Sequence, residues 1–432
     1  MAYPSWRAGE LPLDTNGFPI PCWTHLIEAL PILGRPITLA CPVGGVDALS
    51  HGLKEMKYDN CVVKYYCDVD VELEPVLRAL HGSGAGLLVG PEVGNILHTD
   101  VESWERVDGI VCGPPCPPFS TSGKRKRSED QRSFVYKRVT DAIARQGQLG
   151  CFFFVVENVP GVRHVPSGSL ASFQNEWVDD LARRAPMFHI QEWMMQSAAF
   201  VPQNRRRLYT VGWNWYALGC VPVPPLTPFR AAVSRATLAD VLHRGLPQVD
   251  EASLTPQQKL NLAMVKNKLL ANFQTSGEGW ATFSVDRDPS KGYNDPLRRD
   301  GCVNTLRTHN ELTWVLYMDR LGEFAFSRCL HPVERCALQG FRPELANLLS
   351  KSGLLRATGN SFTVPVVVAV FGQCLKALVH ASSLSEASVP RPISSAQRGD
   401  HENVVSVLRK TRMLNIERHK IAILDCEAKG GR

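Results

Sequence analysis

The stretch VCGPPCPPFS, residues 111–120, decides the fold and organises the rest of the chain. The apolar run from Gly109 to Cys112 is typical of the end of a buried strand, and the prolines that follow exclude both a helix and a continued strand. They hold Cys116 on a rigid turn at the carboxyl end of that strand, where open α/β sheets bind ligands. This pattern favours a thiol nucleophile, although a cysteine so placed can also be a small buried hydrophobe.

Two further stretches bring polar side chains to the same predicted sheet edge. The apolar run 151–156 ends in Glu157, which predicts a second buried parallel strand that delivers a carboxylate. The segment QNRRR, residues 203–207, precedes a strand-like run at 208–212. A period of two puts Arg205 and Arg207 on one face of that run. A thiol, a carboxylate and two guanidinium groups would then share one site.

Attack on a pyrimidine ring explains this combination of groups. Carbon C6 of cytosine is weakly electrophilic, so it needs a strong nucleophile such as a thiolate. An ordinary cysteine has a pKa of about 8.5, and nearby arginines would raise its ionised fraction. A carboxyl group at ring N3 would donate a proton as charge develops, an effect worth roughly 10²- to 10⁴-fold. Arginines near O2 would stabilise the same charge.

These blocks resemble the cytosine-C5 methyltransferase family, and they occur in that family's order between residues 37 and 378. The blocks are PPCPPFS (114–120), GKRKRSEDQRS (123–133), FVVENVPGV (154–162), VPQNRRRLY (201–209), ERCALQGF (334–341) and GNSFTVPVV (359–367). The resemblance implies a Rossmann-like α/β sheet that binds S-adenosylmethionine, with a smaller target-recognition domain. It makes Cys116 the attacking thiol, sets Glu157 at the cytosine and makes Arg205 and Arg207 catalytic.

The segment ITLACPVGGVDALSHGL, residues 37–53, predicts a strand, a glycine turn and a helix, which is the layout of a nucleotide-cofactor loop. We call residues 43–47 the cofactor loop. The family pattern there is DLFAGxGG. Ala40 replaces its phenylalanine and Pro42 its first glycine, so the loop lacks some of the conformations that glycine permits.

The resemblance also implies which residues hold the cofactor. Asp68 would accept hydrogen bonds from the ribose hydroxyls, although a solvated turn aspartate is the alternative. Asn95, which replaces an aspartate of the family, would accept a bond from the adenine amino group, and Ile96 would pack on its ring. The full predicted set is Val43, Gly44, Gly45, Asp68, Asn95, Ile96, Pro114 and Asn360.

The predicted substrate contacts lie in three places. The basic cluster 124–127 falls in the loop that closes over the target base in the family, so we expect Ser120, Lys124 and Arg125 to contact DNA. A nuclear localisation signal is a second reading of the cluster, and the two are compatible. Gln203 belongs to the QxRxR block, and Thr305 and Arg307 resemble the motif that closes the recognition region. The target cytosine must flip out of the duplex to be reached.

Composition and periodicity divide the chain into five parts. They are an irregular lead-in (1–36), a catalytic and cofactor-binding domain (37–212), a target-recognition region in which the sheet pattern stops (213–328), a return to the catalytic domain (329–380), and a linker with a basic tail (381–432). Within them, 257–270 and 364–378 predict helices.

Bulk properties set the broad class. The 13 cysteines are scattered, which favours reduced thiols inside the cell over a disulfide or zinc framework, and we expect no metal. A net charge of +6 is compatible with a polyanionic partner. We read no long apolar run and no signal peptide, so we expect no membrane segment. A eukaryotic source would place the protein in the nucleus.

Together these features predict a DNA cytosine-5 methyltransferase that acts on duplex DNA. Two alternatives stay open. One is the same chemistry on a structured RNA, as in the transfer-RNA branch of the family. The other is a DNA-binding protein that has lost cofactor binding, which Ala40, Pro42 and Asn95 motivate.

Overall fold

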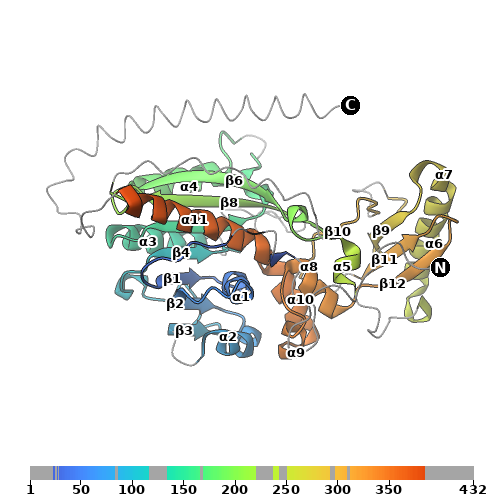
Figure 1. Ribbon diagram of the computed structural model, residues 1–432, viewed down its shortest axis with the longest axis horizontal. Helices are drawn as coiled ribbons and strands as arrows, with labels where there is room; N and C mark the ends of the chain where they lie inside the picture. The colour runs from blue at the N-terminus through green and yellow to red at the C-terminus, as the bar shows by residue number, and fades with distance from the viewer. Residues whose placement is uncertain are drawn as a thin grey trace.

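The computed structural model shows a large lobe built on one twisted sheet and a small lobe built on a second sheet (Figure 1). It describes residues 23–24, 27, 29–82, 86–115, 134–165, 169–219, 237–242, 251–291, 297–308 and 312–384.

Seven strands form the sheet of the large lobe, in the order β3-β2-β1-β4-β5-β8-β6. Their bounds are β1 Ile37–Pro42, β2 Cys61–Asp68, β3 Gly86–Val89, β4 Gly109–Cys112, β5 Phe153–Asn158, β6 Phe188–Gln196 and β8 Arg206–Asn214. The first five strands are parallel, and β8 runs antiparallel to both β5 and β6. This confirms the predicted Rossmann-like sheet, with β4 and β5 as parallel neighbours.

Helices cover both faces of this sheet. The helices α1 (Ala48–Glu55), α2 (Glu74–His81) and α11 (Val364–Leu384) share one apolar core with the sheet, and α3 (Phe134–Gln148) and α4 (Phe173–Arg184) share the other. The predicted helix at 364–378 is confirmed. Its run of valines has a weak helix propensity, so burial, more than propensity, favours this helix.

The expectation of no long apolar run was wrong for α11. Over Val364–Ala381 its mean hydropathy is 1.7, enough by length and composition to cross a membrane, but 78% of that window is buried inside the protein. Its apolar residues share one core of the large lobe with the sheet and α1. That packing accounts for the hydropathy of a core helix.

The small lobe has a sheet of its own, so the expectation that the sheet pattern stops after residue 212 was wrong. Strands β9 (Gly279–Ser284), β11 (Thr313–Met318) and β12 (Phe324–Cys329) form an antiparallel sheet in the order β12-β11-β9. Helix α6 (Pro256–Ala271) shares an apolar core with this sheet, which confirms the helix expected at 257–270. The strands were missed because β9 and β11 pair although 28 residues separate them in the chain, a distance that no local pattern spans.

Short elements join the two lobes. Strand β7 (Gln203–Asn204) pairs with β10 (Val303–Asn304), and α8 (Pro332–Gln339), α9 (Leu345–Leu348) and α10 (Lys351–Asn360) carry the chain back to the large lobe. The short helices α5 (Leu238–Val241) and α7 (Phe273–Ser276) complete the described part of the small lobe.

The strand order points to the site. Strands β1 and β4 are neighbours, yet the chain leaves β1 toward β2 and β3 on one side and leaves β4 toward β5 on the other. Ligands of open α/β sheets bind outside the carboxyl ends of the strands at such a switch point. The cofactor loop follows β1 and the proline-rich turn follows β4, so both begin at this crevice.

Candidate active site

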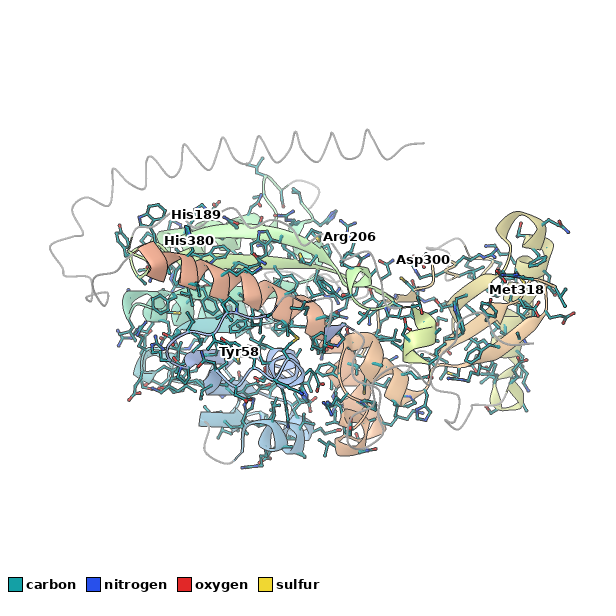
Figure 2. The ribbon with its side chains drawn as sticks, in the orientation of Figure 1. Tyr58, His189, Arg206, Asp300, Met318 and His380 are labelled. Atoms are coloured by element: carbon teal, nitrogen blue, oxygen red, sulfur yellow. The ribbon has the colours of Figure 1, made fainter. Side chains whose placement is uncertain are left out.

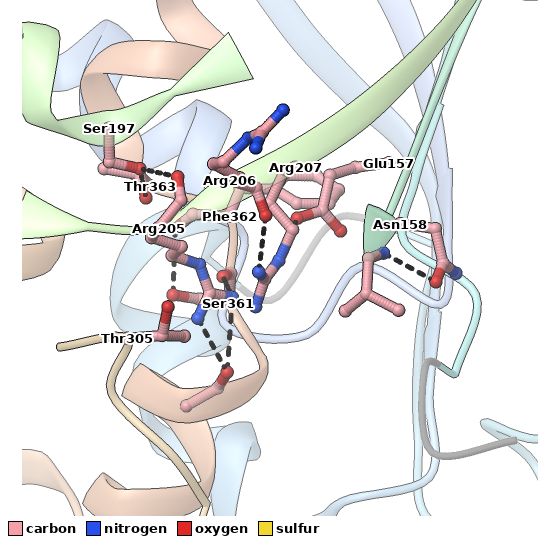
Figure 3. Close-up of polar contacts among 12 residues, drawn as sticks. Glu157, Asn158, Ser197, Arg205, Arg206, Arg207, Thr305, Ser361, Phe362 and Thr363 are labelled. Carbon is pink, nitrogen blue, oxygen red and sulfur yellow. Dashed lines mark hydrogen bonds and ion pairs between the residues drawn. The ribbon is translucent and has the colours of Figure 1, made fainter. Parts of the chain in front are cut away.

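Glu157 lies near the carboxyl end of β5, a strand whose six residues are all buried. Its carboxyl group is buried too, and Arg207 Nε of the adjacent strand β8 lies 3.0 Å from Glu157 Oε1 (Figure 3). The Arg207 Nε–H does not point at Glu157 Oε1, so the contact is an ion pair without a hydrogen bond. The structure thus brings together two of the four predicted catalytic residues.

Burial sets the protonation of Glu157. Removal from water raises the pKa of its carboxyl group, and the charges of Arg207 and Arg205 lower it, but burial is the larger effect. The net pKa is raised above the ordinary glutamate value. A carboxyl group with a raised pKa keeps its proton to higher pH and can donate it to a ring nitrogen.

Asn158, the next residue, fixes the start of the proline-rich turn. Its side-chain Nδ2 donates to the Pro114 carbonyl at 3.0 Å and to the Tyr136 hydroxyl, and its Oδ1 accepts from the Val159 N–H. Pro114 is thereby tied to the strand that carries Glu157. We did not predict a role for Asn158. Its place beside Glu157 in the same block was the available signal.

Four predicted site residues lie outside the described residues: Cys116, Ser120, Lys124 and Arg125. Their roles therefore stay predictions. One described range stops at residue 115, directly before the predicted nucleophile, and the next begins at residue 134.

Arg205 has a different environment from Arg207. Its side chain is 1% exposed, and its guanidinium group donates to the carbonyls of Gly359 (3.2 Å) and Ser361 (2.6 Å). Gly359 lies in the last turn of α10 and Ser361 directly follows that helix, so Arg205 ties the start of β8 to the returning chain. Figure 3 shows Arg206 on the other side of the strand, pointing away from both neighbours. The side chains therefore alternate as predicted, but only Arg207 reaches Glu157.

Gln203, Thr305 and Arg307 all lie where the two lobes meet. Gln203 is fully buried, and its Nε2 donates to the Leu338 carbonyl of α8 at 3.0 Å. The Thr305 hydroxyl donates to the Asn204 carbonyl at 2.7 Å, and the Arg307 carbonyl accepts from Arg335 at 2.9 Å. These contacts join the lobes, and the predicted contacts of the three side chains with DNA stay predictions.

The cofactor loop is bound to the end of β2. Asp68 Oδ2 accepts from the Gly45 N–H at 2.9 Å, and Oδ1 accepts from the Asp70 N–H at 3.0 Å. Burial raises the pKa of Asp68, and these backbone bonds oppose the rise only in part. Each oxygen keeps a second lone pair, so Asp68 can still accept bonds from ribose hydroxyls.

The loop also contacts the catalytic side of the crevice. The Gly113 N–H donates to the Val43 carbonyl at 3.3 Å, which links the proline-rich turn to the cofactor loop. Gly44 is packed so closely that a Cβ there would lie 2.4 Å from the ring of Tyr66, whereas a Cβ on Gly45 would meet open space. Gly45 therefore forms an open part of the loop surface.

Three further predicted cofactor residues lie in different surroundings, and their roles stay predictions. Asn95 uses its Oδ1 to accept from the Leu97 N–H at 3.1 Å. Ile96 is 3% exposed and belongs to the core beside Ala40. Asn360 is exposed at the end of α10.

The chemistry of these residues fits S-adenosylmethionine. A half-buried carboxylate with spare lone pairs lies at the end of β2, and an open glycine turn precedes the N-terminus of α1, where backbone N–H groups favour a negative charge. In the described part of the chain no cluster of histidine, cysteine and acidic side chains could hold a metal ion.

Known proteins match this chain over most of its length. The family model described as C-5 cytosine-specific DNA methylase matches residues 43–376. The Type II methyltransferase M.HpaII of Haemophilus parainfluenzae is 35% identical over 283 residues, which cover 63% of this chain and 73% of that protein. The orphan methyltransferase M.Rho11sI of Bacillus phage rho11s is 28% identical, and the match covers 39% of this chain and 29% of that protein.

A solved structure shows the same fold. The DNA modification methyltransferase encoded within a prophage of E. coli superposes with a TM-score of 0.50 at 17% identity, over 80% of this chain and 99% of that one.

Proposed function

The chain belongs to the C-5 cytosine-specific DNA methylase family, and we propose that it methylates C5 of a cytosine that is flipped out of duplex DNA. One observation carries the proposal. Glu157 is buried at the carboxyl end of β5 with a raised pKa, beside Arg207, and its neighbour Asn158 holds the turn that leads to Cys116. A proton donor for ring N3 and a thiol for C6 would approach the same base from adjacent strands.

The residues of this chain would act in sequence. Cys116 adds to C6 as a thiolate, and the electron pair released into the ring is stabilised as Glu157 protonates N3. Carbon C5 then becomes nucleophilic and accepts the methyl group. Loss of the C5 proton to solvent, cleavage of the bond between sulfur and C6 and return of the N3 proton to Glu157 restore the aromatic ring and free Cys116 as a thiolate.

Arg207 and Arg205 would serve this reaction in different ways. Arg207 limits the rise in the Glu157 pKa and orients its carboxyl group through the ion pair. Arg205 is a positioning residue, because its guanidinium group holds the carbonyls of Gly359 and Ser361 at the end of α10. Asn158 is a second positioning residue, through its bond to Pro114.

The family takes its methyl group from S-adenosylmethionine, which supplies an electrophilic methyl on sulfur. In this chain the methionine end would lie against Val43, Gly44, Gly45 and Pro114, and the ribose against Asp68. Asn95, Ile96 and Asn360 would line the adenine side.

Several findings favour DNA as the substrate. M.HpaII is a Type II methyltransferase, and the matching family model is described as C-5 cytosine-specific DNA methylase. The net charge of +6 suits a polyanion. Both DNA and S-adenosylmethionine are intracellular, so we place the activity inside the cell; a nucleus stays a prediction for a eukaryotic source.

The test is transfer of a labelled methyl group to duplex DNA and, in parallel, to transfer RNA. We expect label at C5 of cytosine in DNA, loss of transfer in Cys116→Ala with DNA binding retained, and normal transfer in the control Cys61→Ala. Label only in RNA would establish the RNA alternative. DNA binding without transfer or cofactor binding would establish the cofactor-less alternative, and full activity of Cys116→Ala would contradict the covalent mechanism.

A further inference from the structure

We propose that His81, the last residue of α2, is a positioning residue that holds the cofactor loop in its binding conformation through Asp47. The proposal rests on the proposed function, because it assigns His81 a part in binding S-adenosylmethionine.

The cofactor loop has an unfavourable backbone. Val43 has φ 58° and Asp47 has φ 48°, both in the left-handed region, as does Gly45 at 64°. L-residues other than glycine avoid this region at a cost of roughly 1–2 kcal/mol each, and a β-branched residue such as Val43 is a rare occupant. Strained residues of this kind persist only where surrounding contacts determine their conformation.

Asp47 is the main point of attachment at the far end of the loop. Its side chain is 3% exposed, and its Oδ1 accepts from the Ser50 N–H at 3.1 Å, which caps α1. His81 Nε2 lies 2.8 Å from the other oxygen, Oδ2. Burial alone would raise the pKa of Asp47, but the hydrogen bond and charge of His81, with the bonds from Ser50, outweigh it and lower the pKa. The buried carboxylate thus depends on His81.

Two other side chains hold the middle of the loop. Asp68 accepts from the Gly45 N–H, and the Tyr66 hydroxyl donates to the Gly45 carbonyl. Tyr66 is fully buried, and its ring centroid lies 6.2 Å from that of His81. The conformation of the cofactor loop is therefore imposed by the next strand and helix along the chain. His81 is the contact that the family resemblance did not indicate.

Loss of the His81 contact would leave a buried carboxylate with one fewer partner. Asp47 would then move toward water, and the loop would populate other conformations. The apparent affinity for the cofactor falls in proportion to the fall in the fraction of molecules whose loop is correctly formed. The chemical step, which takes place at Cys116 and Glu157, would be unaffected once cofactor is bound.

The experiment compares wild type with His81→Ala, with His81→Gln, whose side-chain amide can still donate to Asp47, and with the control His189→Ala. His189 is exposed on β6, at the opposite edge of the sheet (Figure 2). Affinity for S-adenosylhomocysteine is measured by calorimetry, and hydrogen exchange is measured on a peptide covering residues 43–50 without ligand. We expect His81→Ala to weaken binding about 10-fold, or ~1.4 kcal/mol, and to speed exchange of the loop.

His81→Gln should restore both measurements to within about threefold, and His189→Ala should change neither. With saturating S-adenosylmethionine, kcat of His81→Ala should stay near that of wild type while KM for the cofactor rises. Wild-type affinity and exchange in His81→Ala would overturn the proposal, as would a fall in kcat alone. If the wild-type protein does not bind S-adenosylhomocysteine, the proposed function fails. Unchanged hydrogen exchange of the cofactor loop in His81→Ala would separately overturn the role of His81.

Discussion

Two parts of the candidate site lie at the carboxyl ends of the parallel strands, and different kinds of contact hold them in place. We call them the catalytic edge and the cofactor edge. At the catalytic edge, formed by the ends of β4, β5 and β8, side chains face one another: Glu157 pairs with Arg207 in a buried site. At the cofactor edge, formed by the cofactor loop and the end of β2, side chains hold the backbone. Asp68 accepts from the Gly45 N–H, the Tyr66 hydroxyl donates to the Gly45 carbonyl, and His81 holds Asp47. The first arrangement sets the protonation of Glu157, and the second sets the conformation of the cofactor loop.

This difference explains how the two edges tolerate change. The chemistry of the catalytic edge depends on the identity of a few functional groups, and these match the family blocks. On the proposed function, the cofactor edge would present backbone to its ligand, so Ala40 and Pro42 could depart from the family pattern while contacts from β2 and α2 maintain the loop. Substitutions at the two edges should therefore affect different steps.

The largest effect should come from Glu157→Gln. An amide of the same shape cannot donate a proton as ring charge develops, so we expect methyl transfer to fall by at least about 10²-fold. Calorimetry with S-adenosylhomocysteine should give wild-type affinity, because Glu157 does not contact the cofactor loop. A parallel loss of affinity would show that the two edges are not separate.

Next comes Arg205→Ala, which should lower the free energy of unfolding by about 3 kcal/mol. It removes charged hydrogen bonds to the Gly359 and Ser361 carbonyls and leaves them buried without these partners. Urea denaturation measures the loss. The matched control is Arg206→Ala, an exposed neighbour that should cost no more than about 0.5 kcal/mol. Equal losses in both variants would contradict the joining role of Arg205.

The cofactor edge can be tested with two adjacent glycines. In Gly44→Ala the new Cβ meets the buried Tyr66 ring at 2.4 Å, so we expect overpacking of about 1–3 kcal/mol and weaker cofactor binding. In Gly45→Ala the Cβ has open space, and the cost is the φ of 64°, about 1 kcal/mol. Both are measured by urea denaturation and calorimetry. A larger effect at Gly45 would mean that Tyr66 does not set the loop.

The smallest effect concerns the pH dependence of stability. The pKa of Glu157 in the folded protein is raised above 4.5, its ordinary value in the unfolded chain. At a pH between 4.5 and the raised pKa, the unfolded chain has released a proton that the folded protein retains. The free energy of unfolding of wild type relative to Glu157→Gln should therefore fall as pH rises above 4.5 and level off above the raised pKa. Urea denaturation of both proteins across pH 4 to 8 would reveal this slope, and a rise with pH would contradict a raised pKa.

Local pattern predicted the large lobe well and the small lobe poorly. Strands β4 and β5 are unbroken apolar runs bounded by polar residues or prolines, so their burial and parallel pairing followed from the residues alone. Strands β9 and β12 include half-exposed residues, so their apolar pattern is broken. Their common sheet with β11 depends on pairings between segments that are separated in the chain.

In the candidate site, the sequence by itself determined which functional groups reach the crevice, because parallel strands deliver the residues at their carboxyl ends to one edge. It thus indicated Glu157 and the turn leading to Cys116, and it identified the family. Only the tertiary structure decided that Arg207 pairs with Glu157 while Arg205 joins distant segments, and that Asn158 and His81 hold the two loops. The physical reason is that a side chain's partner and burial depend on segments far along the chain, which no local period or spacing encodes.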